Sequence, residues 1–125
     1  MKNLIIDAAN DKIIFSFITD NQSYTTSHTN SRENFDKFMN LLLFFLNKNK
    51  LKIDDIDRIF INQGPGKFSS LRISISIAKA ISLAKNISLY GFDSKFIKNG
   101  NYKKLLEIDK KNLLNNDLIK PHYSS

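Results

Sequence analysis

Short apolar and β-branched runs, separated by turn-forming residues, open the chain. Residues 3 to 7 predict a buried strand, and the turn residues around Asn10 lead into a second run over 13 to 18. A third run over 23 to 26 is rich in hydroxyl side chains, which suits the edge of a sheet. The pattern therefore predicts a hairpin followed by an edge strand.

The hydrophobic period changes after residue 29. Apolar side chains at helical spacing predict a helix from about 30 to 47, with the stripe Phe35, Phe38, Met39, Leu42, Phe45 and Leu46. Asn30 with Glu33 forms an approximate capping box, and Ser31 is an alternative cap. Residues 41 to 46 are apolar nearly all round, so we expect another helix, the tail or another protein to cover the second face.

A parallel unit is predicted in the second half of the chain. Residues 56 to 62 form a fourth strand that leads into a glycine-rich loop. The next segment alternates like a strand from Arg72 to Ile77, but its unbroken length to Lys85 favours a helix, here one of thin cross-section. Residues 87 to 90 are a fifth strand. The tail from Lys95 is less regular, with short helices expected near 102 to 107 and 112 to 115.

Composition narrows the class of protein. The 125 residues, 42% apolar and 25% charged, suit one globular domain. No apolar run approaches the roughly 20 residues of a membrane span and no signal-peptide pattern is present, so we expect a cytoplasmic protein with no membrane partner. The lack of cysteine excludes disulfides and cysteine-ligated zinc. A net charge of +7 fits an acidic partner such as RNA, although the lysines are scattered among acidic residues.

The loop from Gly64 to Ser70 carries the most chemical information. A glycine-rich loop between a strand and a helix suits an anion, because free backbone N–H groups and the helix dipole face the same spot. A Walker A loop is excluded, because Ile61 replaces its first glycine and Phe68 follows Gly66-Lys67. The candidate anion contacts are Gly64, Pro65, Gly66, Lys67, Phe68, Ser69 and Arg72. The alternative is a tight turn with Ser69 or Ser70 capping the helix.

No catalytic set, metal site or cofactor is predicted. His28 and His122 are far apart and lack a spacing that places two ligands on one helix. Ser69 or Ser70 as a nucleophile would need a base and an orienting group, and no convincing third member can be named.

The same loop resembles a family signature. Residues 63 to 74 are similar to the sequence Gly-Pro-Gly-Ser-Phe-Thr-Gly-Leu-Arg-Ile-Gly of the TsaB (YeaZ) family. The identical positions are Gly64, Pro65, Gly66, Phe68, Leu71, Arg72 and Ile73. The opening strand, Ala78-Lys79-Ala80 and residues 90 to 94 agree in order, so the resemblance covers about residues 3 to 94. Residues 120 to 123 resemble the Pro-x-Tyr end of family members.

This resemblance implies a fold. It is an α/β fold, a single actin-like ATPase (ribonuclease H-like) lobe with a five-stranded mixed sheet, two main helices and a short helical tail. Family members have two lobes and are nearly twice as long. Residues 1 to 94 are therefore interpreted as the first lobe, and residues 95 to 125 as a reduced remnant of the second lobe or a C-terminal tail.

The resemblance also implies a non-catalytic scaffold subunit of the complex that places a threonylcarbamoyl group on the tRNA adenosine next to the anticodon. In catalytic relatives, an Asp after the first strand works with a Gly- or Thr-containing turn around nucleotide phosphates. Here Ala8-Ala9-Asn10 follows Asp7, which we interpret as a turn-capping residue rather than a magnesium ligand. The His-x-x-x-His motif of the catalytic paralogue TsaD is also missing.

The implied partners are TsaD, bound through a bundle of first-lobe helices, the ATPase TsaE, tRNA through the complex, and a second copy of the chain when it is alone. The candidate TsaD-binding positions are Phe38, Leu41, Leu42, Phe45, Leu71, Ser74, Ile75 and Ala78. Three alternatives stay open: a metallopeptidase-like glycoprotease, a small ATP-binding module, and an RNA-contacting adaptor that uses the lysine-rich tail.

Overall fold

A five-stranded mixed sheet forms the centre of the protein, and the computed structural model describes residues 1–97 and 101–110. The strands are β1 (Asn3–Asp7), β2 (Lys12–Ile18), β3 (Ser23–Thr29), β4 (Arg58–Asn62) and β5 (Ser88–Phe92). Their order is β3-β2-β1-β4-β5. The strands β1, β2 and β3 pair antiparallel, whereas β1, β4 and β5 pair parallel. The predicted mixed sheet and the edge position of the third strand are confirmed.

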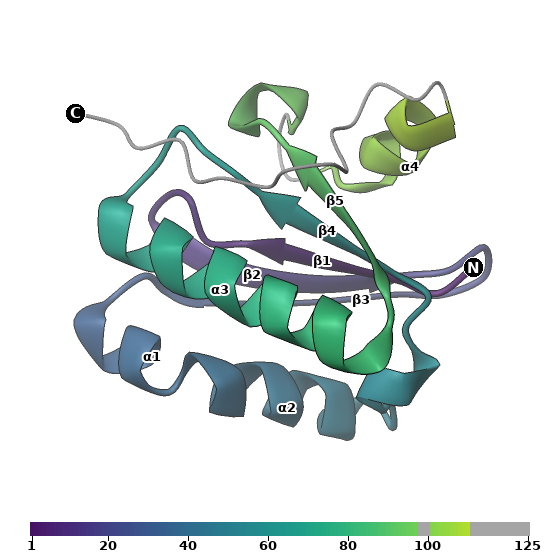
Figure 1. The fold of residues 1–125 in the computed structure, drawn as a ribbon, viewed down its shortest axis with the longest axis horizontal. Coiled ribbons are helices and arrows are strands. Elements are labelled where there is room, and N and C mark those ends of the chain that lie inside the picture. Colours follow the sequence, from purple (N-terminus) through teal and green to yellow (C-terminus); the bar gives the residue numbers. More distant parts are fainter. Residues whose placement is uncertain (98–100, 111–125) are drawn as a thin grey trace.

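Helices cover both faces of this sheet (Figure 1). They are α1 (Arg32–Asp36), α2 (Phe38–Lys48), α3 (Phe68–Lys85) and α4 (Lys103–Lys110), with 3-10 turns at Ile53–Asp55 and Ser94–Phe96. The first three helices lie against one face, and α4 lies against the other (Figure 1). None of the helices in the described part of the chain is both long and apolar enough to cross a membrane.

The predicted helix over 30 to 47 is wrong in one respect, because it is two helices. Its first turn is capped by Ser31, whose hydroxyl accepts a hydrogen bond from the Asn34 N–H at 3.3 Å. The backbone then leaves the helical conformation at Lys37, with φ −119° and ψ 28°. The break escapes the sequence pattern, because the apolar stripe continues from Phe35 before it to Phe38 after it.

The segment after the glycine-rich loop is the helix that its length predicted. α3 ends at Asn86, which adopts the left-handed conformation with φ 54° that asparagine tolerates at a helix end. The Ile87 N–H donates to the Ser82 carbonyl at 3.0 Å, which closes the last turn. β5 therefore begins at Ser88, one residue later than predicted, and extends to Phe92.

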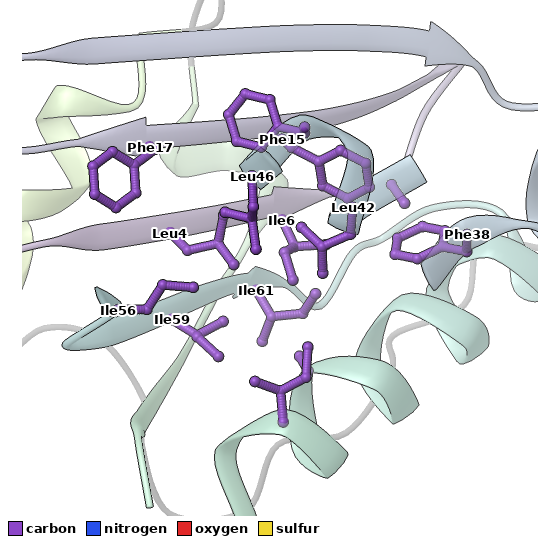
Figure 2. Packing of buried hydrophobic residues seen from close by; sticks show 14 of the residues in the cluster. Leu4, Ile6, Phe15, Phe17, Phe38, Leu42, Leu46, Ile56, Ile59 and Ile61 are labelled. Carbon is purple, nitrogen blue, oxygen red and sulfur yellow. The ribbon is translucent and has the colours of Figure 1, made fainter. Parts of the chain in front are cut away.

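The main core lies between the sheet and the helices α2 and α3 (Figure 2). Alternate side chains of β1, Leu4 and Ile6, point into it because side chains of a strand alternate between its faces. The Phe15 ring meets the Phe38 ring edge-on, with centroids 5.4 Å apart. Helix α3 therefore supplies part of the expected cover for the second face of α2, because its residues Ile75 and Ala78 belong to the main core.

The opposite face of the sheet carries a smaller core. Ile5 and Phe60 of the sheet pack there with Tyr102 and Leu105, which lie at the start of α4. The predicted helix near 102 to 107 is confirmed, whereas the one near 112 to 115 and the Pro-x-Tyr end lie outside the described residues. The division into a lobe over 1 to 94 and a remnant over 95 to 125 stays a prediction.

Ile61 is fully buried in β4 and belongs to the main core, so its truncation tests how much this core contributes to stability. We expect Ile61→Ala to lower the free energy of unfolding by about 2–5 kcal/mol, because it removes buried methyl groups and leaves a cavity. Leu83→Ala is the matched control, since Leu83 is 87% exposed and should change stability by less than about 0.5 kcal/mol. Urea unfolding followed by circular dichroism measures the unfolding free energy of both variants. Equal losses in the two variants would contradict the assigned core.

Candidate functional site at the carboxyl ends of the parallel strands

The three parallel strands end at one edge of the sheet, where ligands of open α/β sheets commonly bind. Asp7 ends β1, Asn62 ends β4, and Ser94 follows β5. The Asn62 amide donates to Asp7 Oδ1 at 2.9 Å. The Asn62 Oδ1 in turn accepts from the Gly64 N–H at 2.8 Å and from the Ser94 hydroxyl at 3.2 Å. One hydrogen-bonded network therefore joins the three strand ends.

Asp7 is buried, and both of its carboxylate oxygens accept hydrogen bonds from the chain itself. The Tyr102 hydroxyl donates to Oδ2 at 2.6 Å from the start of α4. The predicted turn-capping contact, from the Ala9 N–H to Oδ1, is present at a longer 3.5 Å. Asp7 thus holds its turn, but the shorter bonds come from Asn62 and Tyr102.

Burial raises the pKa of the Tyr102 phenol well above its ordinary value, and the negative charge of Asp7 and the hydrogen bond to it act in the same direction. Tyr102 is therefore a hydrogen-bond donor to Asp7 at neutral pH. The two side-chain donors meet the hydrogen-bonding needs of this buried carboxylate without a cation.

The glycine-rich loop lies directly against the turn between β1 and β2. A Cβ atom on Gly66 would lie 2.3 Å from the Ala9 carbonyl oxygen, so this position has no room for a larger residue. The Lys67 N–H donates to that oxygen at 2.9 Å, and the Lys67 ammonium pairs with Asp11 at 3.1 Å. Lys67 is thus engaged with this turn, and anion contact by the loop stays a prediction.

The expected cap of α3 by Ser69 or Ser70 is wrong, because the helix begins at Phe68 with Lys67 as its N-cap residue. The Ser70 hydroxyl instead donates to the Lys67 carbonyl and accepts from the Asn30 amide at 3.0 Å. Asn30 also donates to the Ala8 carbonyl at 3.1 Å. This buried asparagine therefore ties the start of α3 to the turn after β1.

The candidate TsaD-binding positions lie on α2 and α3 as predicted, but all except Leu41 are buried in the chain's own fold. Exposed large apolar side chains on the same two helices are Leu43, Phe44, Phe68 and Leu83. A shallow groove of about 390 Å³ follows α3 and is lined by Phe68, Ser69, Arg72, Ile73, Ser76 and Ile77. The Arg72 guanidinium lies over the Phe68 ring at 5.8 Å from its centroid.

Sequence reasoning missed Asn62 and Tyr102. A polar residue at the end of the otherwise apolar strand Arg58–Asn62 is a readable signal, because parallel strand ends meet. Tyr102 gives no such signal, since it lies in the irregular tail. Within the described ranges no three His, Asp or Glu side chains gather as metal ligands. His28 lies half-buried on β3, and His122 falls outside those ranges.

Comparison with known proteins identifies the family. The model described as TsaD, tRNA N6-adenosine threonylcarbamoyltransferase, matches residues 18–95. A TsaB protein, named for tRNA threonylcarbamoyladenosine biosynthesis, from Buchnera aphidicola is 29% identical over 73% of this chain and 43% of its own length. A tRNA N6-adenosine threonylcarbamoyltransferase from Desulfotalea psychrophila is 48% identical over 35% of this chain and 13% of its own length. The chain thus spans less than half the length of these relatives.

Solved structures agree on the fold. YeaZ from Pseudomonas aeruginosa superposes with a TM-score of 0.68 and 15% identity over 74% of this chain and 43% of YeaZ. RuvC from T. thermophilus, solved with a Holliday junction, gives a TM-score of 0.52 and 8% identity over 90% of this chain and 78% of RuvC. The predicted actin-like (ribonuclease H-like) fold and the predicted resemblance to TsaB (YeaZ) are confirmed. The chain therefore belongs to the family described as TsaD, tRNA N6-adenosine threonylcarbamoyltransferase.

Proposed function

We propose that this chain is a non-catalytic subunit of tRNA threonylcarbamoyladenosine biosynthesis that binds a TsaD-type catalytic subunit. The similarity to a protein named for this pathway supports the process. TsaE and tRNA, the latter through the complex, are the further partners in this proposal, as the resemblance to TsaB implies.

The occupied Asp7 carboxylate is the observation that carries the non-catalytic role. In catalytic relatives, as the resemblance implies, this acid works beside the nucleotide phosphates. Here Asn62 and Tyr102 donate to its two oxygens, so a metal ion would have to compete with those donors for the carboxylate. The neighbouring loop is closed against the same turn by the contact of Gly66 with Ala9. These contacts favour a structural role for the strand ends.

The outer side of α3 is the proposed surface for the catalytic subunit. Phe68 is 52% exposed at the start of the helix, and Leu83 is 87% exposed near its end. Between them the groove is lined by the half-buried Ile73 and Ile77, with the small exposed Ser76 beside them. An apolar groove with a small residue at its centre lets a partner helix approach closely. Leu41 on α2 is the one candidate of the sequence that keeps partial exposure.

Reconstitution tests the function as a whole. We expect the TsaD-type subunit and TsaE of the same organism, given their substrates, to form threonylcarbamoyladenosine on tRNA only when this chain is added. Mass spectrometry of digested tRNA measures the product. The chain alone should neither hydrolyse ATP nor cleave protein substrates in the presence of divalent metal. Either of those activities would favour the ATP-binding or the metallopeptidase reading instead.

Ser76→Arg tests the proposed surface without touching the core, because Ser76 is exposed in the middle of α3 and arginine is a better helix former than serine. We expect about a tenfold or greater loss of affinity for the TsaD-type subunit, about 1.4 kcal/mol or more, because the long side chain fills the groove. Isothermal titration calorimetry measures the affinity.

The matched control is Ser88→Arg, which makes the same change at an exposed position at the start of β5. It should bind the catalytic subunit like the unchanged chain. Equal affinities of both variants and the unchanged chain would show that the α3 groove is not the binding surface.

Tyr102→Phe tests the hydrogen bond to Asp7. We expect the variant to lose about 1–3 kcal/mol of unfolding free energy at pH 7, because a buried charged acceptor loses a donor. The pKa of Tyr102 is raised in the folded chain, so its contribution is complete below about pH 10 and decreases as the pH rises further. The stability difference between the two proteins should therefore narrow above pH 10.

Urea unfolding of both proteins from pH 7 to pH 11 gives this difference, and the ionisation of lysines is common to both. A constant difference over that range would show that the Tyr102 proton is not what stabilises Asp7. The variant should keep its affinity for the catalytic subunit, since Tyr102 and α3 contact opposite faces of the sheet.

A further inference from the structure

A groove of about 290 Å³ lies between the outer strand β3 and helix α2, and aromatic rings line both of its sides. On β3 the lining residues include Tyr24, Thr26 and His28, which alternate along the strand and therefore share one face. On α2 they include Phe44 and Lys48. The Phe44 ring is 65% exposed, so the groove has an aromatic face that the chain itself leaves uncovered.

The two rings on β3 are held in place by the main core beneath them. The Phe17 ring stacks against the Tyr24 ring with centroids 6.4 Å apart, and the Phe15 ring lies 6.3 Å from the His28 ring. Phe15 and Phe17 are fully buried. Tyr24 and His28 are half-buried, so each ring has one side on the core and another side toward the groove. A ligand that stacks here meets rings that are already ordered, which lowers the cost of binding.

Polar groups lie among these rings. In the part of the chain that the structure describes, the side chains of Tyr24, Thr26 and His28 make no hydrogen bond to the protein. An apolar side chain of a partner would cover these groups without replacing their hydrogen bonds to water, which costs free energy. A nucleobase offers both a face that stacks on aromatic rings and an edge that carries donors and acceptors. The lining therefore favours a nucleobase over an apolar peptide.

The charge of the groove suits a phosphate. Its lining residues include no acidic side chain, and Lys48 makes no ion pair with any described residue. Residues four apart on a helix are neighbours, with Cβ atoms about 5–6 Å apart, so Lys48 lies beside Phe44. The chain as a whole carries a net charge of +7. A phosphate attached to a base on the Phe44 ring therefore has a cation within reach.

We propose that this groove binds one unpaired nucleotide of an RNA strand, with its base stacked on Phe44 and its phosphate beside Lys48. The hydroxyl groups of Tyr24 and Thr26 supply hydrogen bonds to the nucleotide. The volume suits a single nucleotide, because pockets for larger ligands start at about 300 Å³. A base inside a duplex cannot enter, since both of its faces are stacked on neighbouring bases.

The inference goes beyond the proposed function, in which tRNA is reached through the complex, because here the chain itself contacts RNA. Only the choice of RNA over other nucleic acids rests on the proposed function. This groove and the α3 groove share no lining residue. RNA binding by the chain alone and affinity for the catalytic subunit are therefore measured separately, and one can fail without the other.

Fluorescence anisotropy of a labelled single-stranded oligoadenylate of about ten nucleotides, titrated with the full chain, tests the stacking contact. We expect Phe44→Ala to weaken binding about tenfold, because the exposed ring that stacks on the base is lost. Phe44→Tyr keeps an aromatic ring and should bind like the unchanged chain. Leu83→Ala is the matched control, since it truncates an exposed apolar side chain on α3, and it should also leave the affinity unchanged.

The same titration at several salt concentrations tests the phosphate contact. Each phosphate contact to a single strand adds about 0.7 to the slope of log affinity against log salt, so Lys48→Gln should make this slope shallower by about that amount. Lys79→Gln is the control, because Lys79 is an exposed lysine on α3 and does not line the groove. It should leave the slope unchanged, and circular dichroism confirms that all variants fold.

Four results would overturn the proposal. The first is no binding of the oligoadenylate at about millimolar chain, an affinity of only about 4 kcal/mol. The second is equal binding of the same strand after pairing with oligouridylate, because no unpaired base would then be needed. The third is equal affinity for free adenosine monophosphate, which would indicate a mononucleotide site. The fourth is a Phe44→Ala variant that binds RNA normally but loses affinity for the catalytic subunit, which would make the groove a protein-binding surface.

Discussion

A buried carboxylate is the constraint on which this arrangement depends. Removing Asp7 from water is costly unless its oxygens keep hydrogen bonds, and the chain supplies donors from two other elements. Asn62 comes from the neighbouring parallel strand, and Tyr102 from the turn that leads into α4. The same bonds fix the end of β4, from which the loop to α3 departs, and hold α4 on the sheet. One charge thus connects the sheet, the loop and the tail.

The hydrogen bonds among the strand ends bear on what this part of the sheet can bind. Ligand sites of open α/β sheets lie at the carboxyl ends of parallel strands because polar groups and loops converge there. In this chain the convergent groups bind one another, and Gly66 brings the following loop against Ala9. A fold whose usual site is internally satisfied has its outer surfaces left for partners. This favours the accessory role proposed above, whereas similarity to the TsaD model alone would equally fit an enzyme.

The sequence predicted the elements better than their contacts. Strands and the long α3 helix follow from hydrophobic period and length, which are local properties. The break at Lys37 was hidden because the apolar stripe crosses it. Most of the candidate partner positions are buried in the chain's own core, because the pattern of α2 cannot tell cover by α3 from cover by another protein. The bond between Asp7 and Tyr102 joins residues 95 positions apart, and no local pattern encodes it.

The α3 groove and the β3 edge offer a partner different kinds of contact. The α3 groove presents side chains, so its specificity depends on the size and shape of residues such as Ser76 and Ile77. The β3 edge presents backbone groups, which any extended strand could satisfy, so its specificity has to come from register and cross-strand pairs. Helix α3 packs near β4 and β5, whereas β3 lies at the far edge beside β2. The α3 groove and the β3 edge therefore lie on different parts of the molecule.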